Sequence, residues 1–145
     1  MLSFKYEEYY SAPSPIKSGV DRVFALSTIP FELLNMEIKT LTVEEVTLVE
    51  LAGEVDANTV PMVQEKVLPL ALPSTKIIID LTKVSYMSSA GLRILLTLYR
   101  QTYAQDGKLV LVGLSSEIQD IMSVTGFLDF FTTCETLESG LKVLK

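Results

Sequence analysis

Histidine is absent from the 145-residue chain, and Cys134 is its single cysteine. Without histidine, the chain has neither a Ser-His-Asp or Cys-His catalytic arrangement nor a histidine-ligated zinc or iron site. A single cysteine forms no disulfide within the chain and no thiolate cluster around a metal, which suits a reducing compartment. The sequence therefore predicts no metal site and excludes histidine-based catalysis.

Basic side chains are scarce, with 12 lysines and arginines against 18 acidic residues and a net charge of −6. Because affinity for nucleic-acid backbones comes largely from clustered basic residues, we expect no direct contact with nucleic acid. Apolar runs stay far below the roughly 18 residues that indicate a membrane span. Glu7 and Glu8 stand where a signal peptide needs a basic start and an apolar run. We expect a cytoplasmic protein that does not contact a membrane.

Glycine-rich phosphate-binding motifs are missing too, since the chain has neither Gly-x-Gly-x-x-Gly nor a P-loop. We therefore expect no cofactor. The remaining route to catalysis is a pair of carboxylates, Asp56 and Asp80, each expected near the end of a strand. A capping or turn contact is the better explanation for each of them, so an enzyme is the least favoured function.

The first 35 residues differ in character from the rest of the chain. Six of the twelve aromatic residues lie there, around a Pro/Ser segment at 11–15 that is typical of a loop. We treat residues 1–35 as an N-terminal extension of unknown role. Met36 directly precedes the first regular strand, so the alternative that the domain starts at this methionine stays open.

From residue 36 onward, strand and helix periodicities alternate. A hairpin is expected around Glu44 and Glu45, and the following helix takes Asn58 or Thr59 as its N-cap. The remaining expected elements are a strand at 77–81, a helix at 91–105 with an apolar stripe at Leu92, Leu95, Leu96, Tyr99 and Tyr103, a strand at 108–112, a helix opened by a capping box of Ser116 and Gln119, an edge strand at 130–133 and a final helix through 137–144. The order β-β-α-β-α-β-α-β-α over residues 36–145 predicts a single α/β domain with a mixed sheet of four to five strands packed with four helices.

One serine-rich segment stands out between the expected strand at 77–81 and the helix that begins near Ala90. It places Ser88 or Ser89 at the helix N-cap, where a serine stabilises the helix by about 1 kcal/mol relative to alanine. A second explanation is that a helix N-terminus also stabilises a phosphate, so a phosphorylated serine is tolerated there. Phosphorylation adds roughly −1.5 to −2 charges, enough to disrupt a partner surface fitted to small neutral residues.

The string Tyr86-Met-Ser-Ser-Ala-Gly-Leu92, which follows Ile77-Ile-Ile-Asp-Leu81, resembles the signature of the STAS family. Gly53-Glu-Val-Asp-Ala-Asn-Thr59 resembles the family's Gly-Glu-Leu-Asp segment, and Ser123-Val-Thr-Gly-Phe-Leu128 resembles its Ser-Gly-Leu segment. The matches fall in the family's order and cover essentially all of residues 36–145. The family includes bacterial anti-sigma-factor antagonists and the cytoplasmic domains of sulphate transporters.

The resemblance implies a regulatory binding module and not an enzyme. In such antagonists, a serine-kinase-type anti-sigma factor phosphorylates the serine at the helix start, and a phosphatase reverses this. The unphosphorylated antagonist binds the kinase and releases a sigma factor. Aligned on the motif, the phosphoacceptor falls on Ser89, and Ser88 occupies a position that is commonly Asp, which makes Ser88 a second candidate acceptor. We expect the partner-binding surface to comprise Asp56, Asn58, Thr59, Met87, Ser88, Ala90, Gly91 and Arg93.

An alternative follows from the same substitution at Ser88. A STAS scaffold or small-molecule-sensing module that is never phosphorylated needs no acidic residue at this position. The sequence does not decide between the two functions, nor does it predict an oligomeric state.

Overall fold

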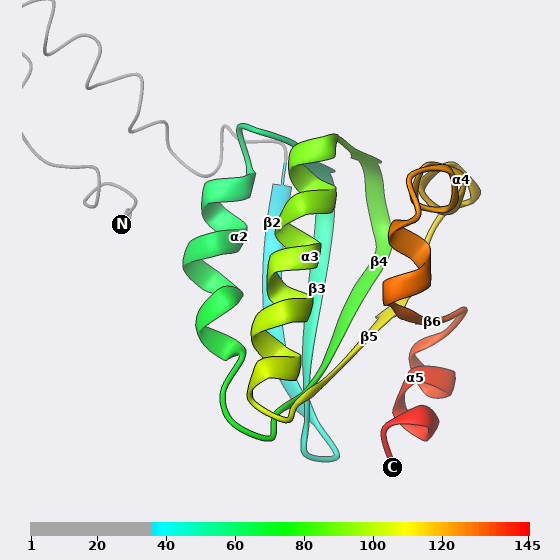
Figure 1. The fold of residues 1–145 in the computed structure, drawn as a ribbon. Helices are drawn as coiled ribbons and strands as arrows, with labels where there is room; N and C mark the ends of the chain where they lie inside the picture. The colour runs from blue at the N-terminus through cyan, green and yellow to red at the C-terminus, as the bar shows by residue number, and fades with distance from the viewer. Residues whose placement is uncertain (1–35) are drawn as a thin grey trace, which may run out of the picture. The chain divides into compact units, whose positions relative to one another are not determined.

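The structure, a computed structural model, describes residues 36–145, in which five strands form one mixed sheet (Figure 1). The strands lie in the order β2-β3-β4-β5-β6, with β2 antiparallel to β3 and the other neighbours parallel. Their bounds are Met36–Val43, Val46–Val55, Lys76–Met87, Lys108–Val112 and Thr132–Cys134. Because β3 to β6 are parallel, their carboxyl ends meet at one edge of the sheet, where the chain turns into the helices.

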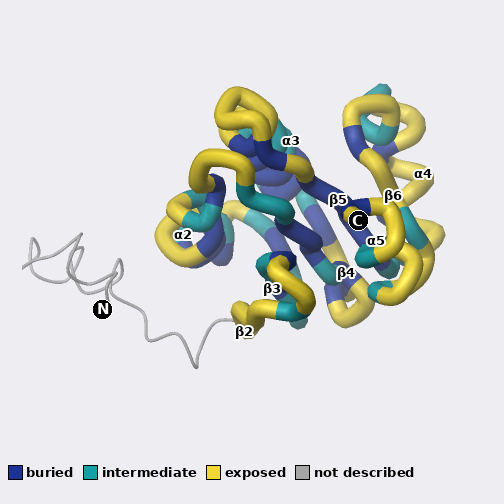
Figure 2. The backbone as a smooth tube through the Cα atoms, turned by 90° about the horizontal axis from the view of Figure 1, so that it is seen from below, coloured by how far each residue is buried: buried dark blue, intermediate teal, exposed yellow. Residues whose placement is uncertain are grey.

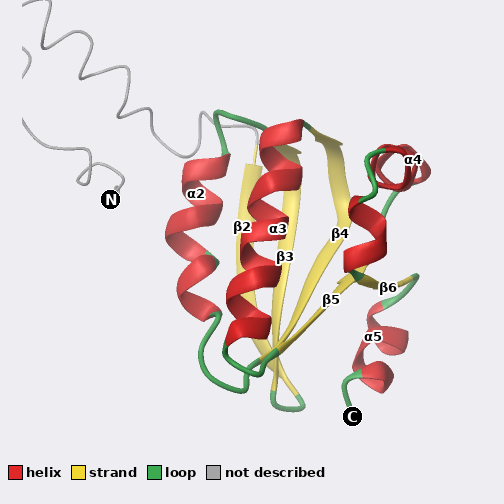
Figure 3. Ribbon diagram, viewed as in Figure 1, coloured by secondary structure: helices red, strands yellow, loops and turns green. Residues whose placement is uncertain are grey.

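Helices pack on both faces of this sheet, and Figure 3 shows α2 and α3 in front of the strands. The apolar sides of α2 and α3 cover one face together with residues of α4, and α5 covers the other. The helices are α2 (Val60–Lys66), α3 (Ser89–Ala104), α4 (Ser116–Val124) and α5 (Leu137–Val143), with 3-10 turns η2 (Leu68–Leu70) and η3 (Phe127–Phe130). The predicted α/β fold, with a mixed sheet and four α-helices, is confirmed.

The two-sided packing explains the continuous apolar run at the start of β4. Ile77 and Ile79 point into the core under α2 and α3, whereas Ile78 points into the core under α5, and all three are at most 1% exposed. A strand buried on both faces needs apolar residues at every position, not at alternate ones. Figure 2 shows the result as buried strands in the middle with exposed segments on the outer sides of the helices.

Strand β4 is longer than predicted. It was expected to end near Leu81, but it continues to Met87, with Gly53 opposite Val84 and Val55 opposite Met87 on β3. The second half is polar and exposed at several positions, and its pairing with β3 shifts register twice. Apolar residues therefore do not alternate regularly along it, and the sequence does not show it to be a strand. Ser85 therefore lies on the strand and not in a loop.

The buried face of α3 also differs from the predicted stripe. Leu92 and Leu95 are buried as predicted, but Tyr103 is exposed. The ring of Tyr99 lies 5.4 Å from that of Phe131, between centroids, so the segment before β6 covers this flank of the helix. The buried residues of α3 are Gly91, Leu92, Ile94, Leu95, Leu98 and Thr102.

Three boundaries move by one to two residues. The N-cap of α4 is Ser115, whose hydroxyl accepts a hydrogen bond from the Ile118 N–H at 3.2 Å, so the predicted capping box at Ser116 was one residue late. Helix α3 begins at Ser89 and not at Gly91. The edge strand starts at Thr132, because residues 127–130 form a 3-10 turn. The predicted N-terminal extension, residues 1–35, lies outside the described residues.

Candidate functional site

Ser88 is the N-cap of α3, directly after the end of β4. Its backbone is extended, and its hydroxyl oxygen accepts hydrogen bonds from the N–H groups of Ala90, at 3.2 Å, and Gly91, at 3.5 Å. The first amides of a helix have no partner within the helix, so this cap satisfies two of them. The Ser88 side chain is therefore committed to holding the start of the helix.

Ser89, the first residue of α3, is in a different situation. It is exposed, and within residues 36–145 its hydroxyl has no hydrogen-bond partner. Arg93, also exposed, lies four residues later, where helical side chains are neighbours on one side of the helix. The structure thus separates the two serines into one that caps and one that is free.

A second loop, after β3, is held by Asp56 and Thr59. One oxygen of the Asp56 carboxylate accepts from the backbone N–H groups of Asn58, at 2.9 Å, and Thr59, at 3.2 Å. The Thr59 hydroxyl donates to the carbonyl of Glu54 at 2.8 Å and accepts from the Asp56 N–H at 2.9 Å. Thr59 stands at the N-cap position of α2, but its hydroxyl bonds back to the strand instead of capping the helix.

The two loops lie against each other at the carboxyl ends of β3 and β4. The Ser88 N–H donates to the carbonyl of Val55 at 2.9 Å. A Cβ atom on Gly91 would stand 2.7 Å from that same carbonyl oxygen and 2.7 Å from Cγ of Met87. The first turn of α3 therefore approaches β3 as closely as only a glycine permits, which places Asp56 beside the start of α3.

The predicted surface residues divide into two groups by burial. Thr59, Met87 and Gly91 are buried, so they shape the site and present little side-chain surface to a partner. The accessible members are Asp56, Asn58, Ser88, Ala90 and Arg93, which are exposed or half-buried, as is the predicted phosphoacceptor Ser89.

The two carboxylates considered for catalysis are not brought together. Asp80 lies within β4 opposite Glu50, six positions before Asp56 along the neighbouring strand, a separation of about 20 Å at the usual rise per residue. Its carboxylate accepts from the backbone N–H and hydroxyl of Thr82, at 2.9 and 2.6 Å. The expectation that Asp80 lies near a strand end was wrong, and each carboxylate serves a local contact.

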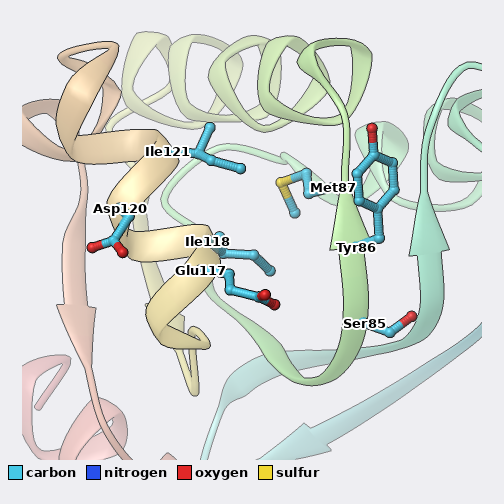
Figure 4. A pocket seen from close by; sticks show the side chains of 7 residues that line it. All are labelled: Ser85, Tyr86, Met87, Glu117, Ile118, Asp120 and Ile121. Carbon is cyan, nitrogen blue, oxygen red and sulfur yellow. The ribbon is translucent and has the colours of Figure 1, made fainter.

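The sequence did not predict a hollow of about 400 Å³ beside this site (Figure 4). It lies between the end of β4 and α4, and in the sequence α3 and β5 separate these two elements. Its lining residues are Ser85, Tyr86, Met87, Glu117, Ile118, Asp120 and Ile121. The sequence signal was the apolar residue Ile121 among the polar residues of a short helix, and the structure leaves this side chain 41% exposed at the hollow.

Neither a metal site nor a membrane helix is found in the part of the chain that the structure describes. Residues 36–145 contain no group of three or more acidic or cysteine side chains placed to hold a metal ion. No helix among these residues is both long and apolar enough to cross a bilayer.

Comparison with known proteins identifies the family. The model of the STAS domain family matches residues 37–140, and the chain belongs to this family. The anti-sigma-B factor antagonist of Bacillus subtilis is 30% identical over 109 residues, which cover 75% of this chain and all of that protein. Such antagonists are binding regulators, so the expectation that the chain is not an enzyme is confirmed.

Solved structures share the fold. An anti-sigma factor antagonist from Mycobacterium paratuberculosis has a TM-score of 0.69 and 24% identity, covering 75% of this chain and 93% of that one. The phosphorylated form of the Bacillus cell fate determinant SpoIIAA has a TM-score of 0.59 and 20% identity, covering 75% of this chain and all of that one.

The contact between Gly91 and β3 predicts a cost for any side chain at this position. Gly91→Ala should lower the free energy of unfolding by about 1–3 kcal/mol, because an added methyl in a packed region forces the helix away from Val55. Ser89→Ala in the same helical turn is the matched control and should stay within about 0.5 kcal/mol of wild type. Denaturant unfolding measures both, and equal stability of the two variants would contradict the close approach.

The capping role of Ser88 gives a second prediction. Ser88→Ala should destabilise the domain by about 1 kcal/mol, because two amides at the start of α3 lose their acceptor. Ser88→Asp should retain wild-type stability, because aspartate is an equally good cap and its charge favours a helix N-terminus. If both variants unfold at the same denaturant concentration, the Ser88 hydroxyl does not hold the helix.

Proposed function

We propose that this chain is an anti-sigma-factor antagonist whose partner binding is switched by phosphorylation of Ser89. In the unphosphorylated form it binds a serine-kinase-type anti-sigma factor and so releases a sigma factor. Phosphorylation by that kinase ends the complex, and a phosphatase restores the binding form. Because these reactions use ATP and act on the transcription machinery, we place the protein in the cytoplasm.

The observation that carries the proposal is the separation of roles between the two serines. Ser88 provides the cap, so the exposed Ser89 hydroxyl is available for modification without loss of a bond that holds α3. Ser88 remains the second candidate, but it is half-buried and its hydroxyl oxygen already accepts from the N–H groups of Ala90 and Gly91, so it is less accessible to a kinase. The role of antagonist is supported by the relatives that carry this name, and a protein of the same fold, SpoIIAA, has a phosphorylated form.

The proposed switch follows from charge. Before modification, small neutral side chains surround the site, with Ser88 and Ala90 on either side of Ser89, so a partner surface approaches closely. A phosphate adds roughly −1.5 to −2 charges beside the Asp56 loop. The helix N-terminus and the neighbouring Arg93 keep the modified protein folded. Repulsion then acts on the complex, where each 1.4 kcal/mol lowers affinity about tenfold.

The transfer itself needs only the chemistry of the kinase partner. The Ser89 oxygen attacks the γ-phosphorus of ATP held by the kinase, its O–P bond forms as the bond to the β-phosphate oxygen breaks, and ADP leaves. A base on the kinase takes the hydroxyl proton. This chain contributes position, since the first turn of α3 sets where the backbone of Ser89 lies and leaves its side chain exposed.

Substitution of Ser89 tests the switch. Ser89→Asp should weaken binding to the anti-sigma factor at least tenfold, because it introduces a charge at the centre of the contact, whereas Ser89→Ala should bind as wild type. Ser139→Asp is the control, since Ser139 is an exposed serine near the start of α5, on the opposite face of the sheet. Calorimetric titration against each serine-kinase anti-sigma factor of the host measures the affinities. Equal binding by Ser89→Asp and Ser89→Ala would contradict the switch.

The acceptor is identified by mass spectrometry after incubation with ATP and host extract. Trypsin releases residues 84–93, which contain Ser85, Ser88 and Ser89. We expect the phosphate on Ser89. A phosphate on Ser88 alone would move the acceptor by one residue, and an unmodified peptide in an active extract would favour the alternative function, a scaffold or small-molecule sensor that is never phosphorylated.

A further inference from the structure

The hollow between β4 and α4 combines an apolar floor with an acidic side. Met87 and Ile118 form the floor and are each 3% exposed. In Figure 4, Ile118, Ile121 and Glu117 point from α4 towards β4, while the carboxylate of Asp120 points away. Within the described residues, neither Glu117 nor Asp120 has an ion-pair partner. The hollow therefore offers an unpaired carboxylate next to buried apolar surface.

The hollow is open to solvent and suits a protruding side chain better than an enclosed small molecule. Two of its lining residues, Tyr86 and Ile121, are 51% and 41% exposed. Exposed apolar side chains gathered at one place mark a surface that a partner covers. Arginine and lysine match this mixture, because their aliphatic stems cover apolar surface while their cationic heads reach a carboxylate. A purely apolar side chain would leave Glu117 desolvated and unpaired.

The hollow begins close enough to Ser89 for a kinase that acts on this serine to cover it. Its lining residue Met87 is two residues before Ser89, a distance of less than about 8 Å along the chain. A standard interface covers about 800 Å² on each partner, which corresponds to a disc of about 16 Å radius. A partner face of this size that is centred on the Ser89 hydroxyl extends over the end of β4 and towards the facing side of α4.

We propose that this hollow receives an arginine or lysine side chain of the anti-sigma factor and so determines which partner is bound. The inference rests on the proposed function for the identity of the partner. The net charge of −6 favours a basic partner face, and the cation pairs with Glu117 while its stem packs on Ile121 and Met87. Helix α4 is thus part of the binding surface, in addition to the segments around Asp56 and Ser89.

A charge reversal with a matched control tests the proposal. Glu117→Lys should weaken binding of the anti-sigma factor at least tenfold, because a like charge then meets the incoming cation. Glu138→Lys is the control and should bind within twofold of wild type. Glu117 and Glu138 are both exposed and both occupy the second position of a short helix, after the N-caps Ser115 and Thr136, so both substitutions cost the same interaction with the helix dipole. Thermal unfolding verifies that the two variants are equally folded.

Substitution of the partner identifies the cation. Among variants of the anti-sigma factor in which single exposed arginines or lysines are changed to Glu, one should bind Glu117→Lys better than it binds wild type.

If wild type binds and Glu117→Lys binds equally well, the hollow lies outside the interface and the inference fails while the proposed function stands. If wild type binds no serine-kinase anti-sigma factor, the proposed function fails and the inference with it. If a small cationic ligand occupies the hollow instead, it would raise the unfolding temperature in a Glu117-dependent way. If a second copy of the chain occupies it, a Glu117-dependent dimer would form. In both cases Glu117→Lys would leave binding of the anti-sigma factor unchanged, which would overturn the inference.

Discussion

The close approach of α3 to the carboxyl end of β3 is the contact on which the rest of the site depends. A parallel pair of strands brings Val55 and Met87 level, but the chain then leaves both strands in different directions. The hydrogen bond from the Ser88 N–H to the Val55 carbonyl joins the two departing segments, and the missing side chain of Gly91 lets the helix stay there. A larger residue at 91 would separate the loop of Asp56 from the serine that follows β4. Two short segments far apart in the sequence form one surface for this reason.

The start of α3 also explains why the adjacent residues Ser88 and Ser89 differ in their hydrogen bonding. A helix N-terminus leaves amides without acceptors, and one hydroxyl in extended backbone geometry is enough to satisfy two of them. The next residue is already helical, so its side chain points outward and bonds to nothing in the described part of the chain. In the proposed mechanism the modified residue is the one whose hydroxyl has no structural task. In this mechanism Ser88 stabilises the helix and Ser89 is modified, so neither side chain has to serve both purposes.

Much of this arrangement could be predicted from the sequence, and the two largest failures have a common cause. The hairpin at Glu44 and Glu45, the strand at 108–112 and the motif that places Ser88 and Ser89 at a helix start all depend on local pattern and were correct. Strand β4 was cut short because its second half is stabilised by pairing with β3, which residues near Asp80 do not reveal. The stripe of α3 was misplaced because the sheet beneath the helix buries Ile94 and Leu98 and leaves Tyr103 exposed. Where contacts with residues distant in sequence determine whether a side chain is buried, the local spacing of apolar residues does not predict its burial.

The role of α4 illustrates this limit most clearly. Taken alone, residues 116–124 form an amphipathic helix with Ile118 and Met122 buried, and nothing in that pattern distinguishes Glu117 from any solvated glutamate. Only the fold sets Glu117 opposite Met87, across a hollow that two exposed apolar residues border. A carboxylate in water attracts cations weakly, whereas one beside apolar surface that a partner covers discriminates between charges strongly, because the pair is then shielded from water. In the proposed mechanism, recognition at this surface therefore depends on where the sheet places an ordinary side chain, and the motif around Ser89 supplies the chemistry of the switch without specifying the partner.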